Sequence, residues 1–138
     1  MDFNVLFLLL ATLVTASQGT VKRTSVPLGE EFRIKIGQQV TIGGQKLKIK
    51  FSAVQDESRC PTGVQCVWEG NAAVVVRVLK KHGKAVEATL NTNPSVKPVQ
   101  LEHEGYSIKL VGLNPYPKAD QRIEPNDYEA VLQVTKEL

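Results

Sequence analysis

The side chains of this chain that are best suited to chemistry are two cysteines and two histidines. Cys60 and Cys66 lie six positions apart, with Pro61 and Gly63 between them. Proline fixes its own φ and glycine reaches positive φ, so a short loop of this composition can bring two sulfurs within bonding range. A redox pair usually has two intervening residues at the start of a helix. The spacing therefore predicts a structural disulfide that closes a loop.

His82 and His103 are the candidates for catalysis or metal binding. They lack metal-ligand spacing to each other. His103 lies between two glutamates and could be a general base, but an exposed polar turn has the same composition. The acidic loops match no calcium-binding spacing. Phosphate-loop, nucleophile-elbow and His-Glu-x-x-His motifs are also absent from the sequence, so we predict a non-enzymatic protein that uses no metal or cofactor.

Residues 1–19 have the pattern of a signal peptide. The run from Val5 to Val14 is apolar and uncharged, and its length of about ten residues is half of what a membrane span needs. Small residues follow, and cleavage after either Ala16 or Gly19 fits the pattern. We predict secretion to the extracellular space, or to the periplasm if the source is bacterial, and no transmembrane segment in the mature chain. An oxidising compartment also favours the disulfide.

The rest of the chain alternates apolar and polar residues with the period of β-strands. The clearest runs are Phe32-Ile34-Ile36, Leu47-Ile49-Phe51 and Tyr128-Ala130-Leu132-Val134. Turn signals separate about seven or eight such strands, and no helix is convincing. We expect a polar arm over residues 20–29 and one all-β domain over residues 30–138. Its fold should be an antiparallel β-sandwich, immunoglobulin-like, or a small barrel.

The only tryptophan lies next to the cysteine loop. Trp68 follows Cys66 by two residues, so both side chains would point to one face of an extended chain. A tryptophan stacked on a disulfide is a packing arrangement found in two-sheet proteins. We therefore predict that Trp68 belongs to the core, with ligand stacking as the alternative.

The string Ser58-Arg59-Cys60-Pro61-x-Gly63-Val64-x-Cys66-x-Trp68-x-Gly70 precedes a valine-rich strand. This pattern resembles a motif of small secreted or lipid-anchored β-domain proteins, most of them bacterial. The segments 113–117 and 127–128 are similar to the same group. The resemblance implies a small secreted domain and brings no activity with it. This chain differs from the lipid-anchored members in one respect. No cysteine ends its signal segment, so it lacks the residue that would be acylated.

Five cations fall on the outward positions of two early strands: Arg33, Lys35, Lys46, Lys48 and Lys50. If these strands are neighbours, the cations share one sheet face that would attract an acidic polysaccharide, anionic lipid headgroups or nucleic acid. The alternative is a solvated face that discourages edge-to-edge aggregation. No aromatic residues alternate with the lysines, which argues against nucleic acid.

Two functional hypotheses remain open. In the first, the protein is a secreted binding or structural matrix module, and its basic face binds polyanions. In the second, it is an inhibitor or effector that contacts a protein target through the disulfide-closed loop 60–66. The contact residues would then be Pro61, Thr62, Gly63, Val64 and Gln65. The first hypothesis requires salt-sensitive binding, and the second requires that residues 62–65 be exposed and protruding.

Overall fold

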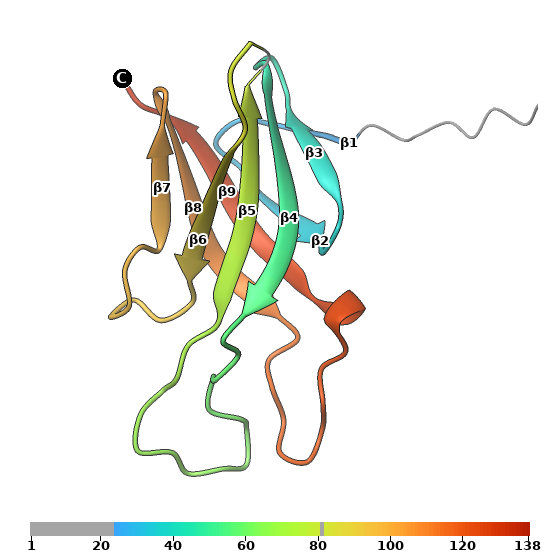
Figure 1. Cartoon of the computed structure of the whole chain (residues 1–138), viewed down its shortest axis with the longest axis vertical. Helices are drawn as coiled ribbons and strands as arrows, with labels where there is room; N and C mark the ends of the chain where they lie inside the picture. The colour runs from blue at the N-terminus through green and yellow to red at the C-terminus, as the bar shows by residue number, and fades with distance from the viewer. Residues whose placement is uncertain (1–23, 81) are drawn as a thin grey trace, which may run out of the picture.

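The computed structural model describes residues 24–80 and 82–138. The predicted signal peptide and the first residues of the predicted arm lie outside this part of the chain. Nine strands in this part of the chain form two facing sheets, and one short 3-10 helix precedes the last strand (Figure 1). The predicted all-β sandwich is confirmed, and two separate sheets replace the alternative of a small barrel. Part of the predicted arm is itself a strand, which pairs in parallel with β3.

The first sheet has five strands in the order β1-β3-β4-β5-β6. Their bounds are β1 Thr24–Val26, β3 Gln39–Ile42, β4 Leu47–Gln55, β5 Ala73–Lys80 and β6 Val86–Asn91. The second sheet has four strands in the order β2-β9-β8-β7. Their bounds are β2 Glu31–Lys35, β7 Gln100–His103, β8 Tyr106–Asn114 and β9 Glu129–Lys136, and the 3-10 helix η1 is Pro125–Asp127.

The core lies between the two sheets and follows the alternation of the sequence. Ile49 and Phe51 on β4 are fully buried, whereas Lys48 and Lys50 are exposed. Successive side chains of a strand point to opposite faces of the sheet, so every second residue reaches the core. The central strand β5 is buried on both faces over Val74, Val75 and Val76, which explains its nearly continuous valine sequence.

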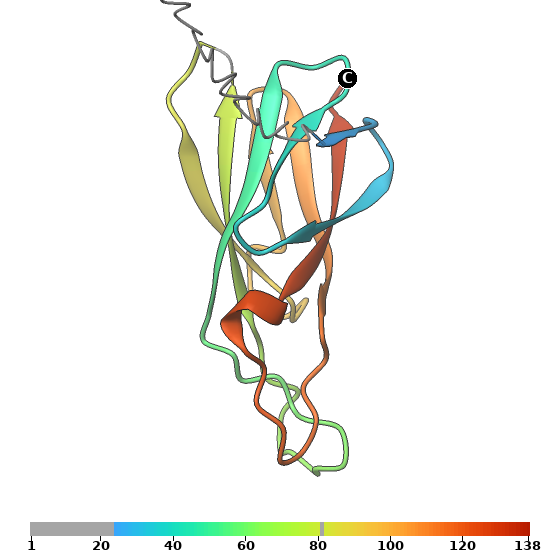
Figure 2. The ribbon, with the colours of Figure 1, turned by 90° about the vertical axis from the view of Figure 1, so that its right-hand side faces the viewer.

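Two long loops extend beyond the sheets at one end of the molecule (Figures 1 and 2). One connects β4 to β5 over residues 56–72 and holds both cysteines, and the other connects β8 to β9 over residues 115–128. Both views place the two loops side by side, and a parallel bridge between Thr62 and Lys118 joins them. We call this pair of joined loops the tip.

Candidate functional site

The cysteine loop is closed as predicted. Cys60 and Cys66 form a disulfide with a Cα–Cα distance of 6.0 Å. The segments that enter and leave this loop, which we call its two arms, also pair with each other. The Ser58 amide donates to the Asn71 carbonyl at 2.7 Å, and the Cys60 amide donates to the Glu69 carbonyl at 2.9 Å. The loop is therefore a narrow, cross-linked projection.

The cysteine loop is also fastened to the neighbouring loop. The Thr62 amide donates a hydrogen bond to the Pro117 carbonyl at 3.0 Å, and the Ala119 amide donates to the Thr62 carbonyl at 3.1 Å. Backbone groups of a loop need partners as those of a strand do. These two bonds supply them, so the two loops support each other.

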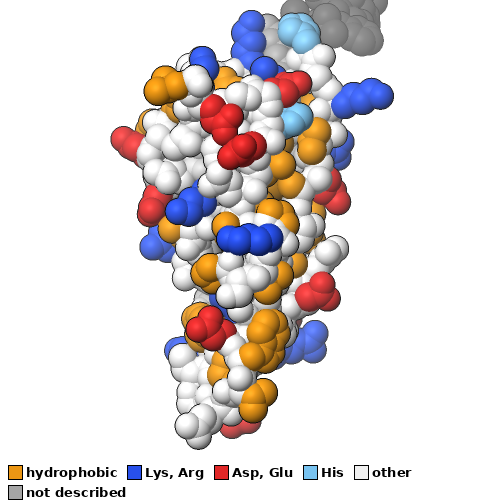
Figure 3. All heavy atoms as spheres, turned by 90° about the vertical axis from the view of Figure 1, so that its left-hand side faces the viewer, with side chains coloured by type: hydrophobic (Ala, Val, Ile, Leu, Met, Phe, Trp, Pro, Cys, Tyr) orange, Lys and Arg blue, Asp and Glu red, His pale blue; other side chains and the backbone are white. Residues whose placement is uncertain are grey.

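The tip exposes hydrophobic side chains. Seven large hydrophobic residues are exposed among the described residues, and four of them lie in the two tip loops: Val64, Val67, Trp68 and Tyr116. Trp68 is 54% exposed, Tyr116 is 50% exposed and Val67 is fully exposed. Figure 3 shows hydrophobic side chains reaching the surface at the narrow end of the molecule. We call the four residues the apolar tip cluster.

The prediction that Trp68 belongs to the core is wrong. Residues 67 and 68 form a bend rather than a strand, so the alternation used for the prediction does not apply to them. The loop also extends past the ends of both sheets (Figure 2). No second sheet lies opposite Trp68 there, and its indole reaches solvent.

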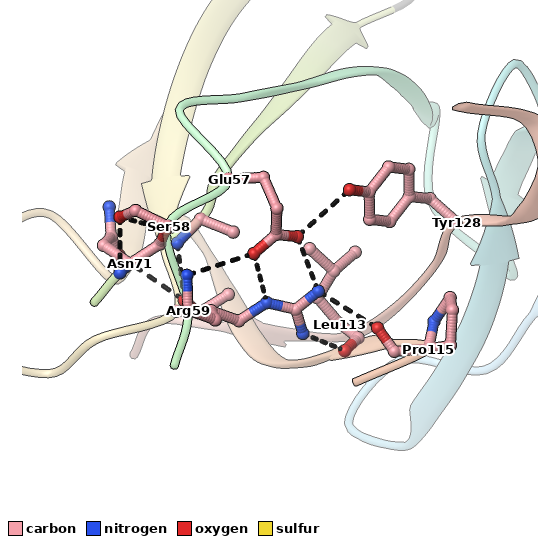
Figure 4. A network of polar contacts seen from close by, with 9 residues as sticks. Glu57, Ser58, Arg59, Asn71, Leu113, Pro115 and Tyr128 are labelled. Atoms are coloured by element: carbon pink, nitrogen blue, oxygen red, sulfur yellow. Dashed lines mark hydrogen bonds and ion pairs between the residues drawn. The ribbon is translucent and has the colours of Figure 1, made fainter. Parts of the chain in front are cut away.

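A buried arginine ties the two loops to the body of the protein (Figure 4). The Arg59 guanidinium donates to both carboxylate oxygens of Glu57, from Nε at 2.8 Å and from Nη2 at 2.7 Å. It also donates to the carbonyls of Leu113 at 2.7 Å and Pro115 at 3.0 Å. Its Cζ lies 5.3 Å from the centroid of the Tyr116 ring. Bidentate, charge-assisted bonds of this kind fix both partners in orientation.

The sequence analysis does not predict this role of Arg59 and names the residue only as part of the cysteine motif. Glu57 lies two residues before Arg59, and this charge pair beside the cysteine loop was the available signal. The carbonyl partners come from residues more than fifty positions away. No local pattern indicates them.

Three buried asparagines join the end of β6 and the loop that follows it to the cysteine loop, close to where that loop meets β5. The Asn71 side chain donates to the Asn91 side chain at 2.7 Å, and the Asn93 amide donates to the Asn71 side chain at 3.0 Å. The Asn93 side chain in turn donates to the Gly70 carbonyl at 2.8 Å. No buried side-chain nitrogen or oxygen of the described residues lacks a partner. A fully satisfied polar network of this kind holds a single arrangement of the chain.

The Tyr128 hydroxyl donates to Glu57 at 3.1 Å, and this pair should make stability depend on pH. Burial raises the pKa of Glu57, but the hydrogen bonds and charge of Arg59, with the Tyr128 hydroxyl, outweigh burial and lower that pKa overall. The ionised Glu57 carboxylate therefore stabilises the fold above the pKa that Glu57 has in the unfolded chain. This stabilisation is lost as pH falls through the lower pKa of Glu57 in the folded protein. Burial and the Glu57 charge raise the pKa of Tyr128 to about 12.

The raised pKa gives the opposite dependence at alkaline pH. The contribution of Tyr128 is complete below the unfolded pKa of about 10 and is lost as pH rises towards 12. We expect Glu57→Gln to reduce the loss of stability at acid pH and Tyr128→Phe to reduce the loss of stability at alkaline pH. Urea midpoints measured across pH for both variants test this. Profiles parallel to that of the unmodified protein would refute it.

The five predicted cations do not share a face. Arg33 and Lys35 lie on β2 in the four-stranded sheet, whereas Lys48 and Lys50 lie on β4 in the five-stranded sheet and Lys46 directly precedes β4. The outer faces of a sandwich point in opposite directions, so the assumption that the two strands are neighbours was wrong. Arg33 is also paired with Glu129 at 3.0 Å.

The histidines stay apart from the tip. His82 lies in the turn between β5 and β6, and His103 ends β7. Among residues 24–80 and 82–138, no group of three or more His, Cys, Asp or Glu side chains is placed to hold a metal ion. Within the same part of the chain, no helix has the length and apolar character of a membrane span.

Comparison with known proteins assigns no family to this fold and site. No family model, curated protein or solved structure matches the chain. The resemblance of the cysteine motif to small secreted proteins therefore stays a prediction.

Proposed function

We propose that this protein is a secreted, non-enzymatic binding module that inserts its tip into an apolar recess of a protein target. The observation that carries the proposal is the apolar tip cluster, held on two cross-linked loops. Exposed apolar groups gathered in one place mark interaction sites more often than scattered ones do. Four of the seven exposed large hydrophobic side chains among the described residues gather here.

The rigid base of the tip favours tight binding. A loop that is ordered before binding loses less conformational entropy when it binds. The disulfide, the loop-to-loop bonds and the Arg59 network each order the tip in advance. Tryptophan and tyrosine supply large contact areas with few rotatable bonds, and they are common among the residues that dominate binding energies.

The charges around the tip favour a protein as the partner. Glu69, Lys118, Asp120 and Arg122 are exposed in the same two loops, and their signs are mixed. An apolar centre with a mixed polar rim is the usual anatomy of a protein interface. A polyanion would instead select a surface of one sign. A hollow of about 340 Å³ beside Tyr116 and Asn93 could receive a side chain of the partner.

The proposed contact set differs from the predicted loop residues. Thr62, Gly63, Val64 and Gln65 are exposed, as an inhibitor loop requires, and Pro61 is half-buried. Thr62 is already bonded to the second loop through its backbone. We therefore place the centre of contact at Val64, Val67, Trp68 and Tyr116, with Gln65 beside them.

The test begins with a photo-reactive amino acid at position 67, used to cross-link the partner in the fluid into which the protein is secreted. The affinity of the purified partner is then measured. Trp68→Ala should weaken binding by about thirtyfold or more, the loss typical of a central aromatic contact. Val111→Ala is the matched control, because Val111 is 43% exposed on β8, outside the tip.

Equal affinities for the Trp68→Ala and Val111→Ala variants would overturn the proposal. A second outcome concerns self-association. If the cross-link joins two copies of this chain, and Trp68→Ala converts a dimer to a monomer in sedimentation, the tip is a dimer contact instead of an insertion element.

A further inference from the structure

A second site lies on the outer face of the five-stranded sheet, away from the tip. Lys48 and Lys50 on β4 and Arg77 on β5 are exposed there, and the strand register sets Lys50 directly opposite Arg77. Lys46 directly precedes the first residue of β4 and continues the row there. Side chains on one face recur every ~6.7 Å along a strand, and neighbouring strands lie ~4.8 Å apart. We call these four residues the basic track.

No carboxylate in the described part of the chain forms an ion pair with the basic track. The ion pairs among the described residues are Arg33–Glu129, Arg59–Glu57 and Lys80–Glu104, and none involves the track. The nearest acidic residue by register is Glu87, opposite Arg77 on β6. Like charges directly opposite each other destabilise a sheet. Glu87 offsets part of this cost at Arg77. Lys48 and Lys50 have no acidic residue directly opposite them on β3 or β5, so their positive charge is left for an anion to neutralise.

A hollow of about 400 Å³ opens beside the track. Its lining includes Lys46 and Lys48, the half-exposed Leu79, the hydroxyl of Thr41 and the amide of Gln45. The Tyr106 hydroxyl donates a hydrogen bond to Gln45, so this rim residue is held in place. The hollow thus combines cations, neutral hydrogen-bonding groups and two leucine side chains, of which Leu79 is exposed and Leu47 is buried.

We propose that the basic track and this hollow bind a linear acidic polysaccharide. The spaced cations match a chain that carries repeated anionic groups, and counterion release supplies the affinity. The hydroxyl and amide groups can bond sugar hydroxyls, and Leu79 can contact the apolar face of a ring. No aromatic residue lines the hollow, so nucleic-acid bases would have no stacking partner. The site is independent of the tip.

Two triple variants with the same change in net charge test the proposal, with heparin as the probe. The site variant is Lys48→Gln, Lys50→Gln and Arg77→Gln. The control is Arg33→Gln, Lys35→Gln and Lys109→Gln, on the outer face of the other sheet. The site variant should lose about tenfold or more in affinity at physiological salt, and its slope of log K against log salt should fall by about two to three. The control should change little.

Equal losses in the two triple variants would show that only net charge matters and would overturn the proposal. A duplex DNA oligonucleotide and phosphatidylserine vesicles are measured at the same salt, and tighter binding to either would overturn the polysaccharide assignment. Trp68→Ala should bind heparin normally. Failure of this site and failure of the tip proposal are therefore distinguishable.

Discussion

Arg59→Ala should destabilise the protein by about 2–4 kcal/mol, because it removes charge-assisted hydrogen bonds and leaves a buried carbonyl without its donor. The Arg59 residue is only 7% exposed, and its guanidinium bonds Glu57 and two backbone carbonyls. Without it, the Glu57 carboxylate loses its counter-charge. The carbonyls of Leu113 and Pro115 lose their charged donor, and the Leu113 carbonyl, whose bond to Arg59 is buried, becomes a costly unpaired acceptor.

The control for this variant is Arg33→Ala. Arg33 also pairs with a glutamate, at 3.0 Å, but its side chain is 68% exposed. An exposed pair contributes at most about 1 kcal/mol. Urea unfolding of both variants measures the difference, and similar losses would contradict the assigned role of Arg59. Hydrogen exchange adds a local reading, because the Thr62 and Ala119 amides should lose protection in Arg59→Ala if the arginine holds the loops together.

Gly70→Ala should cost about 3 kcal/mol, through two causes that can be separated. Gly70 has φ of +73°, and a Cβ there would lie 1.7 Å from the carbonyl oxygen of Ser58. Left-handed backbone costs a non-glycine residue about 1–2 kcal/mol, and forcing an atom into a packed site typically costs 1–3 kcal/mol more. The two arms of the cysteine loop pair at this point, so neither can move aside without breaking the loop base.

Gly44→Ala separates the two causes. Gly44 has nearly the same φ of +72°, but nothing lies within 4 Å of its added Cβ. It should lose only the backbone share of about 1–2 kcal/mol. Free energies of unfolding from urea titrations provide the comparison. If the two alanine variants lose the same free energy of unfolding, the close approach of the loop arms at Gly70 adds no cost, which would contradict the prediction.

The sequence by itself determined the strands and the closure of the cysteine loop. Ile49 and Phe51 were predicted to face inward and Lys48 and Lys50 outward, because the two-residue period of a strand is a local property of the backbone. The Cys60–Cys66 disulfide was predictable for a similar reason, since both partners lie within one short loop.

Only the tertiary structure decided which strands meet and which loops project. β2 pairs with β9, and Arg33 therefore contacts Glu129, ninety-six positions away. Lys50 meets Arg77 instead of the β2 cations. Trp68 has the spacing of a core residue, but its loop passes beyond both sheets. In each case the deciding contact joins residues distant in sequence, and side-chain alternation carries no information about such pairings.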